Sequence, residues 1–383
     1  MRFRWVILAA GTFSQATYTA VPLGMVVLAP TLRSRYGLSL TQIGVILAAP
    51  NLGAITTLYA WGIAADRFGE RAVIGAGLAM TSVCMAALAF VGSFWPLTIL
   101  LLVACALGAG VNSASGRVVL HWFGAGRRGM ALGVRQTAVP IAGVWVAAIL
   151  PVLVAGDDPR NAILSLAAGC LVGGLVGFFV IREGPLADHG SEVPHIPVSL
   201  RDRRMWLLYS GSGLIIAPQV CLLGFFVVFL HDRRDLSTSS AAAVLAVVNI
   251  LGIATRIAAG HWSDVAGSRI GPMRQIALAS TALVVGCALL VSSPIALLVP
   301  VLVVMGCVSI SWNGLSTAAA AEAAGHARSG AALGIQQTVL AVSGAALPIA
   351  FGAIVAAFSW RAGFAVVALF PLAGWRLLAT VPG

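Results

Sequence analysis

The chain carries very little charge for its length. Charged residues make up 9% of its 383 positions, whereas soluble domains carry about 25%. Apolar residues make up 60%, and the mean hydropathy is +0.99. A soluble protein cannot bury this much apolar surface in one core. The composition therefore argues against a soluble domain and predicts a protein that crosses a lipid bilayer many times.

Lysine is absent, and all 23 basic residues are arginine. The net charge of +11 does not indicate nucleic-acid binding, because the arginines are scattered over short loops and form no continuous patch. Their distribution follows the positive-inside rule instead. With a cytoplasmic N-terminus, fourteen arginines fall in inside segments and six in outside segments. We therefore predict that both termini are cytoplasmic, in a plasma membrane taken to be a bacterial inner membrane.

Several chemical signatures are also missing. The six cysteines lie in apolar runs without CxxC spacing, so neither disulfides nor a metal site are expected. The chain has no GxxxxGK[ST] loop, no HExxH motif and no nucleophile constellation. The twelve acidic residues and six histidines all fall in loops or near the ends of apolar runs, which leaves no deep proton relay. We expect no cofactor, no metal and no enzymatic activity.

Twelve apolar runs are long enough to span a bilayer as helices, which takes about 20 residues. Short connections rich in Gly, Pro, Asp and Arg separate them, and the longest polar stretch lies at 182–204. We predict an all-α membrane protein with six-helix bundles at 1–184 and 205–383 and a cytoplasmic linker at 185–204. The runs lie at roughly 5–30, 41–64, 71–91, 95–120, 128–153, 161–181, 205–230, 239–262, 272–291, 294–320, 329–356 and 360–380.

An internal repeat relates the two halves. The stretch from Gly62 to Arg71 returns in degraded form from Gly260 to Arg269, at an offset of 198. A second match, at an offset of 201, relates 127–137 to 328–338, and each of these segments opens a span after a predicted cytoplasmic loop. Six spans per copy predict two halves of the same topology, related by a pseudo-twofold axis along the membrane normal.

This pattern resembles the major facilitator superfamily of secondary transporters. The family signature Gly-x-x-x-Asp-Arg-x-Gly-x-Arg is matched in full by the first copy, whereas the second copy has Val265 in place of the middle arginine. The resemblance covers the whole chain. It implies that superfamily's fold, with two parallel halves and a substrate site at their interface near the membrane midplane.

The resemblance also implies a conformational latch in the signature loops. In the family, the signature acid pairs with a nearby arginine and with the N-terminal end of a helix from the other half, and this stabilises the outward-open state. The helix expected here begins near 328–330. Alternatively, the signature residues only fix topology and loop shape. The expected latch residues are Gly62, Asp66, Arg67, Gly69, Arg71, Asp264 and Arg269.

Three arginines fall within predicted spans. Arg117 lies close to a span end, where it can snorkel to the interface or brace the loops. Arg135 and Arg256 lie about two turns inside their spans, and no acidic residue within a span is available to pair with them. Each could be structural or could bind an anionic substrate through its guanidinium fork. Arg256 further resembles the arginine that contacts the carboxylate in oxalate/formate antiporters and monocarboxylate transporters.

Uncharged polar side chains within spans must face protein or a watery cavity. Asn249 is two helical turns before Arg256 and on the same face. Each such side chain could join two helices, but their occurrence in corresponding spans of both halves favours a cavity. The candidate substrate-binding residues are Arg256, Arg135, Asn249, Gln336, Gln337, Asn313, Trp312, Tyr18 and Gln15.

We interpret the sequence as a secondary transporter that moves a small organic anion, expected to be a carboxylate, by alternating access. A proton or an exchanged anion would be the coupling partner, and a monomer in the lipid bilayer is expected. Two alternatives stay open. One is an exporter of hydrophobic or drug-like compounds, although cationic drugs would need an intramembrane counter-charge. The other is a non-transporting sensor on the same scaffold, for which the longest loop of roughly 20 residues leaves little room for a soluble appendage.

Overall fold

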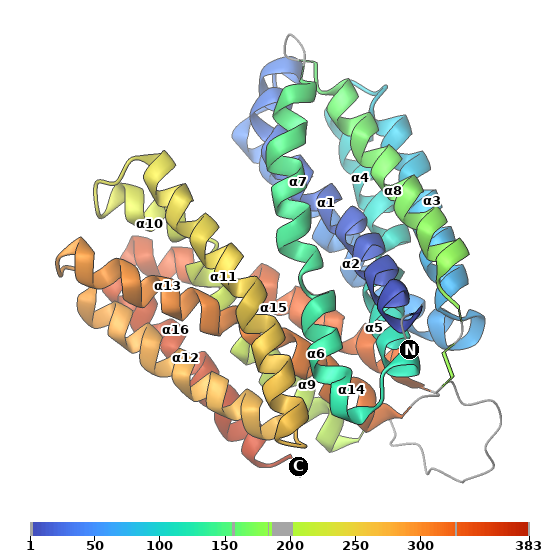
Figure 1. The fold of residues 1–383 in the computed structure, drawn as a ribbon. Coiled ribbons are helices and arrows are strands. Elements are labelled where there is room, and N and C mark those ends of the chain that lie inside the picture. The colour runs from blue at the N-terminus through green and yellow to red at the C-terminus, as the bar shows by residue number, and fades with distance from the viewer. Residues whose placement is uncertain (1–2, 155–157, 183, 186–201, 326–327, 382–383) are drawn as a thin grey trace. The chain divides into compact units, whose positions relative to one another are not determined.

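The computed structural model describes residues 3–154, 158–182, 184–185, 202–325 and 328–381 (Figure 1). Every element in these ranges is a helix, in agreement with the predicted all-α fold. Most of the predicted linker at 185–204 lies outside the described residues. The elements are α1 (Phe3–Tyr36), α2 (Leu40–Phe68), α3 (Glu70–Leu88), α4 (Phe94–Gly108), α5 (Gly110–Trp122), α6 (Ala125–Arg135), α7 (Ala138–Leu153), α8 (Arg160–Val180), α9 (Arg203–Ile215), the π-helix η1 (Pro218–Leu222), α10 (Phe226–Asp232), α11 (Thr238–Val265), α12 (Ile270–Leu290), α13 (Ile295–Ser311), α14 (Asn313–Ala324), α15 (Ser329–Ala357) and α16 (Trp360–Ala379).

Eleven of the predicted spans coincide with single helices, or runs of two or three consecutive helices, that are long and apolar enough to cross a membrane. The remaining predicted span, 5–30, lies in α1. This helix has 34 residues and is about 50 Å long by helical rise. Hydroxyl and amide side chains between positions 12 and 19 lower its hydropathy, and most of them are buried.

Two of the predicted spans are interrupted beside a proline. Pro140 has no N–H to donate to the carbonyl of Gln136, and the chain leaves the helix between α6 and α7 at that point. Pro218 begins the π-helix that separates α9 from α10. By contrast, α1 continues through Pro22 and α15 continues through Pro348. Proline therefore interrupts only some of the helices that contain it, which sequence position alone does not predict.

The described chain divides into two compact units. Unit 1 consists of 1–124, 135–197 and 324–338, and unit 2 consists of 125–134, 198–323 and 339–383. Each unit holds most of one half of the repeat and a short segment of the other half. The exchanged segments, 125–134 and 324–338, overlap the two stretches that the sequence relates at an offset of 201. One therefore includes most of α6 and the other includes the beginning of α15.

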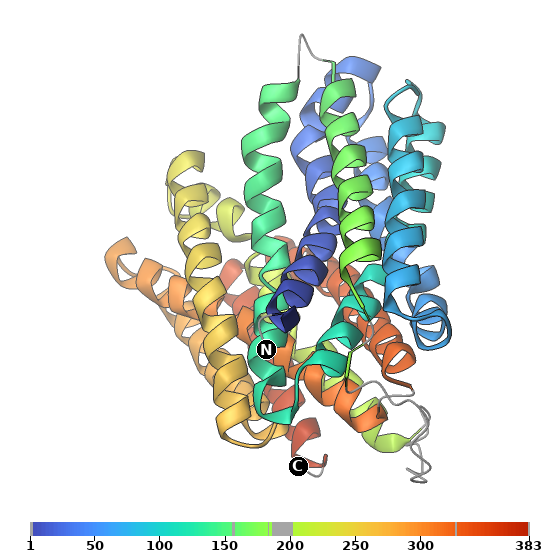
Figure 2. The same cartoon turned by 45° about the vertical axis from the view of Figure 1, so that its right-hand side comes forward.

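Within unit 1, α3 lies along α8 and α2 lies along α4, while α1 contacts both α7 and α8 (Figures 1 and 2). Small residues make this packing close. A Cβ on Gly173 of α8 would overlap the side chain of Thr17 in α1, and a Cβ on Gly53 of α2 would overlap the carbonyl oxygen of Leu102 in α4. Membrane helices pack largely through such close contacts, because lipid provides no hydrophobic drive between them.

Within unit 2, α12 lies along α16, and α11 contacts α13. Aromatic rings form part of the core, and the rings of Phe229 and Phe364 meet edge to face with centroids 5.1 Å apart. Trp360, the first residue of α16, lies 5.0 Å from Phe229 between ring centroids. This cluster holds the start of α16 against α10 and α15.

Candidate functional site

The carboxylate of Asp66 lies at the N-terminal end of α15, in unit 1. The backbone N–H of Gly330 donates to Oδ1 at 2.8 Å, and that of Ala331 donates to Oδ2 at 2.8 Å. Both amides belong to the first turn of α15, where a helix leaves its N–H groups without intrahelical acceptors. A carboxylate is also favoured at the positive end of the helix dipole. The close approach of α2 to the start of α15 depends on glycine, because a Cβ on Gly62 would overlap the carbonyl oxygen of Gly330.

The cation beside Asp66 is Arg117, from α5. Its Nε lies 3.2 Å from Oδ1 of Asp66, and its Nη1 lies 3.2 Å from Oε1 of Glu70. Nη1 also donates to the carbonyl of Ala65 at 2.6 Å. Glu70 lies 2.7 Å from Nδ1 of His121, and both side chains are buried. The carboxylates of Asp66 and Glu70, Arg117 and His121 thus form one network beside the contact with α15, and its Glu70–His121 part is buried.

The arginines of the signature itself lie elsewhere. The guanidinium of Arg67 lies over the ring of the next residue, at 5.6 Å from its centroid. That of Arg71 lies over Phe178 of α8, at 4.2 Å. In the described part of the chain, no ion pair joins either arginine to Asp66. Arg71 is the second residue of α3, which packs against α8, and Arg117 is the arginine beside the acid.

Both signature loops turn at equivalent glycines. Gly69 has a φ of 80° and Gly267 a φ of 63°. Residues with a Cβ rarely adopt these values, which explains why glycine occupies both positions. The N–H of Gly69 closes α2 by donating to the carbonyl of Ala65 at 3.1 Å.

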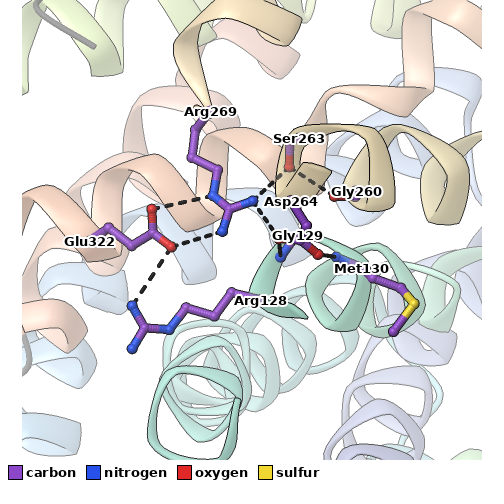
Figure 3. Close-up of polar contacts among 8 residues, drawn as sticks. All are labelled: Arg128, Gly129, Met130, Gly260, Ser263, Asp264, Arg269 and Glu322. Carbon is purple, nitrogen blue, oxygen red and sulfur yellow. Dashed lines mark hydrogen bonds and ion pairs between the residues drawn. The ribbon is translucent and has the colours of Figure 1, made fainter. Parts of the chain in front are cut away.

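The second copy of the signature builds the same contact in unit 2 (Figure 3). Asp264 accepts from the backbone N–H of Gly129 at 2.8 Å and from that of Met130 at 2.9 Å, both in α6. A Cβ on Gly129 would overlap the carbonyl oxygen of Gly260, so glycine again permits the approach. Nη1 of Arg269 lies 2.6 Å from Oδ1 of Asp264. We call the Asp66 and Asp264 arrangements the first and second acid–helix contacts.

Arg269 connects the second acid–helix contact to Glu322 of α14. Figure 3 shows its guanidinium between the two carboxylates, with Nη2 at 3.2 Å from Oε1 of Glu322 and Nε at 3.3 Å from Oε2. Burial lowers the pKa of Arg269, but the hydrogen bonds and charges of Glu322 and Asp264 outweigh this effect and raise its pKa above the ordinary value. Nη1 of Arg128 approaches Glu322 at 3.7 Å. A cavity of about 340 Å³ adjoins this cluster, and Asp264, Arg269 and Glu322 line part of it.

Arg135 is the most deeply buried charged side chain in unit 1, with 1% of its surface exposed. Its Nη1 donates to Oε1 of Gln15 at 2.8 Å, to Oγ of Ser115 at 2.9 Å and to the carbonyl of Asn112 at 3.1 Å. Its Nε and Nη2 have no hydrogen-bond partner among the described residues. These two nitrogens share one edge of the planar guanidinium, the edge that can donate to both oxygens of a single carboxylate.

The remaining candidates of unit 1 have different surroundings. The hydroxyl of Tyr18 donates to the carbonyl of Cys105 at 2.8 Å, and its ring fills the space beside Gly108. Tyr18 thus joins α1 to α4. Gln336 and Gln337 lie in the portion of α15 that belongs to unit 1, where Gln336 is fully buried and Gln337 is half-buried.

In unit 2, Arg256 lies in α11 and is 5% exposed. Its Nε donates to the carbonyl of Ile310 near the end of α13, at 3.1 Å. Asn249 lies two turns earlier in α11 and is exposed, and its amide donates to the carbonyl of Leu245 at 3.0 Å.

Two further candidates flank the interruption between α13 and α14. The indole of Trp312 is fully buried and donates to the carbonyl of Ser309 at 2.9 Å. The amide of Asn313 donates to Oε1 of Gln219 in the π-helix, at 3.1 Å. Trp312 therefore closes the end of α13, and Asn313 connects α14 to the π-helix.

The sequence interpretation missed several partners. Ser115 and Glu322 were not singled out, and Glu70 and His121 were considered only as polar groups near span ends. One available signal was the spacing of Arg117 and His121, which are four residues apart and therefore share a helix face. The sequence carries no comparable signal for Glu322, which meets Arg269 only through the packing of α14.

Known proteins match the chain over most of its length. The Major Facilitator Superfamily matches residues 7–348. The chain belongs to this superfamily. An uncharacterised MFS-type transporter of Mycobacterium tuberculosis (strain CDC 1551 / Oshkosh) is 31% identical over 377 residues, which cover 98% of this chain and 84% of the relative. The hexuronate transporter of Bacillus subtilis (strain 168) is 23% identical over 248 residues, or 62% of this chain and 58% of the relative. A probable sulfoacetate transporter of Cupriavidus necator is 24% identical over 271 residues, or 65% and 62%.

Solved structures of the superfamily share the fold. The proton:xylose symporter XylE superposes with a TM-score of 0.79 at 15% identity, covering 100% of this chain and 96% of XylE. The transporter FucP in an outward conformation gives 0.77 at 13% identity, covering 98% of both chains. The chain thus has the major facilitator fold that the resemblance implied. It is a multi-pass membrane transporter and not an enzyme.

Proposed function

We propose that this superfamily member is a secondary transporter that carries a small organic anion, a carboxylate, across the plasma membrane by alternating access. The observation that supports it best is the free edge of Arg135. A buried arginine without an acidic partner is costly by several kcal/mol. A bound carboxylate would supply the missing negative charge and accept from Nε and Nη2 together.

The surroundings of Arg135 suit such a ligand. Gln15 accepts from Nη1 of Arg135 and from the hydroxyl of Ser115 through the same oxygen, at 2.8 and 3.3 Å. These bonds orient the guanidinium plane while leaving its other edge available. A site held in its binding geometry in this way loses less entropy when the ligand arrives.

Two distant relatives are named for anionic substrates. Hexuronate carries a carboxylate, and sulfoacetate carries a carboxylate and a sulfonate. Both names agree with an anion as the substrate class. In unit 2, Arg256, Asn249 and Asn313 stay candidates for substrate binding by their charge and polarity. A proton or an exchanged anion would provide the coupling.

The two acid–helix contacts complete the proposal as conformational latches. Asp66 binds the start of α15, a helix that continues from unit 1 into unit 2, and Asp264 binds α6, which precedes the return of the chain to unit 1. Alternating access requires the two halves to move against each other. Releasing the two helices from these carboxylates would be part of that movement.

The first test measures thermal unfolding of the purified full chain with acetate, oxalate, glucuronate and sulfoacetate. A ligand that binds only the folded state stabilises it by about 2.7 kcal/mol at 100 times its Kd. Arg135→Lys keeps the charge but loses the planar fork, so we expect at least about tenfold weaker binding. Ser115→Ala keeps the guanidinium of Arg135 but removes one of the hydrogen bonds that orient it. We therefore expect about threefold weaker binding of the carboxylate. Arg160→Gln, at an arginine that lies over Phe90, is the control.

Unchanged carboxylate binding in both Arg135→Lys and Ser115→Ala would contradict the proposed site. Stabilisation by neutral or cationic lipophiles, with none by any anion, would contradict the proposed substrate class and support the exporter alternative. Counterflow of the stabilising anion in proteoliposomes then separates a transporter from a sensor that only binds it.

A further inference from the structure

Two exposed arginines, Arg233 and Arg361, lie at one end of unit 2. There, a cavity of about 520 Å³ is formed by the end of α10, the segment after α12 and the connection between α15 and α16. Arg233, Ser292, Ser359, Trp360 and Arg361 all line it. The arginine bias predicts that these connections face outside, on the side of the membrane opposite the signature loops.

Hydrogen bonds hold the walls of this cavity in place. Nη1 of Arg234 donates to the carbonyl of Val291 at 3.0 Å, and its Nη2 donates to the carbonyl of Ser293. These bonds fix the turn that carries Arg233 against the segment after α12. On the opposite wall, Oγ of Ser359 accepts from the N–H of Ala362 at 3.2 Å and caps α16. The aromatic cluster around Trp360 anchors the same wall.

The charge in this cavity is uncompensated. Arg233 and Arg361 are exposed, and neither guanidinium has a hydrogen bond or an ion pair within the described residues. Asp232 and Asp235 are neighbours of Arg233 in sequence, but both are exposed and neither lines the cavity. Arg361 lies in the first turn of α16, which contains no acidic residue, and positive charge is unfavourable at that end of a helix.

We propose that this cavity is a second anion-binding site, separate from Arg135, and that it takes an oxyanion between Arg233 and Arg361. The serine hydroxyls of Ser292 and Ser359 provide further hydrogen-bonding groups. Phe358, which is 79% exposed, and Trp360 also line the cavity. Free carboxylate or phosphate and the phosphate of an anionic phospholipid share the required chemistry, and the experiment distinguishes these two sources.

The test uses modification of arginine by phenylglyoxal, followed residue by residue by mass spectrometry. The purified full chain is treated in detergent, in phosphatidylcholine nanodiscs and in nanodiscs containing phosphatidylglycerol. Inorganic phosphate or succinate is added to each preparation, and the modification rates are compared with those in sodium chloride of equal ionic strength. Arg33 and Arg35 in the last turn of α1, also exposed, are the internal controls.

We expect the bound anion to slow modification of Arg233 and Arg361 by about tenfold while leaving Arg33 and Arg35 unchanged. Arg361→Gln should raise the anion concentration needed to protect Arg233 by about tenfold. Arg135→Gln should leave the protection of Arg233 unchanged, which separates this site from the proposed substrate site.

Protection by phosphate or succinate in phosphatidylcholine would identify a free anion as the ligand. Protection that appears only with phosphatidylglycerol would identify a lipid headgroup, and either result supports an oxyanion site. The proposal is overturned if none of these additions slows modification of Arg233 and Arg361. It is equally overturned if Arg33 and Arg35 are protected to the same extent.

Discussion

Gly62→Ala is the sharpest perturbation of the first acid–helix contact. The added Cβ would overlap the carbonyl oxygen of Gly330 and lie 2.9 Å from its carbonyl carbon, whereas ordinary contacts begin near 3.4 Å. Both obstacles are backbone atoms, which cannot rotate away as a side chain can. The start of α15 and α2 must therefore separate by about 0.5–1 Å, a change in the range of overpacking costs of about 1–3 kcal/mol.

The separation acts directly on the hydrogen bonds of Asp66. Its two acceptor distances of 2.8 Å would lengthen toward or beyond the useful limit. Hydrogen bonds to a charged group contribute about 1.5–3 kcal/mol each. Losing about 3 kcal/mol in total corresponds to roughly a hundredfold change in the equilibrium between the closed and open contact.

Hydrogen–deuterium exchange measures this equilibrium at the amides concerned. The amides of Gly330 and Ala331 lie in the first turn of α15, so their protection depends on Asp66 rather than on the helix ladder. We expect peptides covering the start of α15 to exchange roughly a hundredfold faster in Gly62→Ala. Gly44→Ala is the matched control, because Gly44 lies in the same helix and a Cβ there meets nothing within 4 Å.

Equal exchange at the start of α15 in Gly62→Ala and Gly44→Ala would refute this reasoning. It would mean that the close approach at Gly62 does not determine whether the start of α15 opens. Asp66→Asn offers an independent check, because it keeps the side-chain volume and removes the charge. Faster exchange in Asp66→Asn alone would show that the acid matters while the glycine contact is more tolerant than its geometry suggests.

Further changes test the second acid–helix contact and the packing of unit 1. Glu322→Gln weakens the interaction with Arg269, and thermal unfolding should show that the free energy of unfolding falls by about 1 kcal/mol. The effect is small because the side chain of Glu322 is 27% exposed. An unchanged unfolding midpoint would show that this ion pair does not stabilise the protein. Gly173→Ala should destabilise the chain by about 1–3 kcal/mol, because its Cβ would overlap the side chain of Thr17. An unchanged midpoint for this variant would mean that α1 and α8 can move apart freely.

The overall fold was predictable because its signals repeat. Three independent signals predict two halves of the same topology: the twelve apolar runs, the repeat at an offset of 198 and the match at an offset of 201. The prediction therefore did not depend on any one of them. The same repeat placed Asp66 and Asp264 at equivalent positions. The resemblance to the family, not the repeat, implied a helix beginning near 328–330 as the partner of Asp66, and the amides of Gly330 and Ala331 bind it.

The neighbours of individual side chains were harder to predict. Arg71 lies closer in sequence to Asp66 than Arg117 does, yet Arg117 is the one beside it. Sequence separation does not predict which of the two arginines lies beside the acid, because this depends on how α3 and α5 pack. Glu70 and His121 were recognised only as polar groups near span ends for the same reason, since they meet across two different helices.

The degraded copy of the signature shows which parts of it the geometry requires. Val265 replaces the middle arginine there and is 74% exposed, yet Asp264 accepts two backbone hydrogen bonds just as Asp66 does. In the first copy, the equivalent Arg67 is exposed, and its guanidinium lies over the neighbouring ring of Phe68. Each contact needs an acid, closely approaching glycines and one cation beside the acid. That cation is Arg117 in one unit and Arg269 in the other, so the requirement is for a charge at a point in space and not for a residue at a fixed place in the motif.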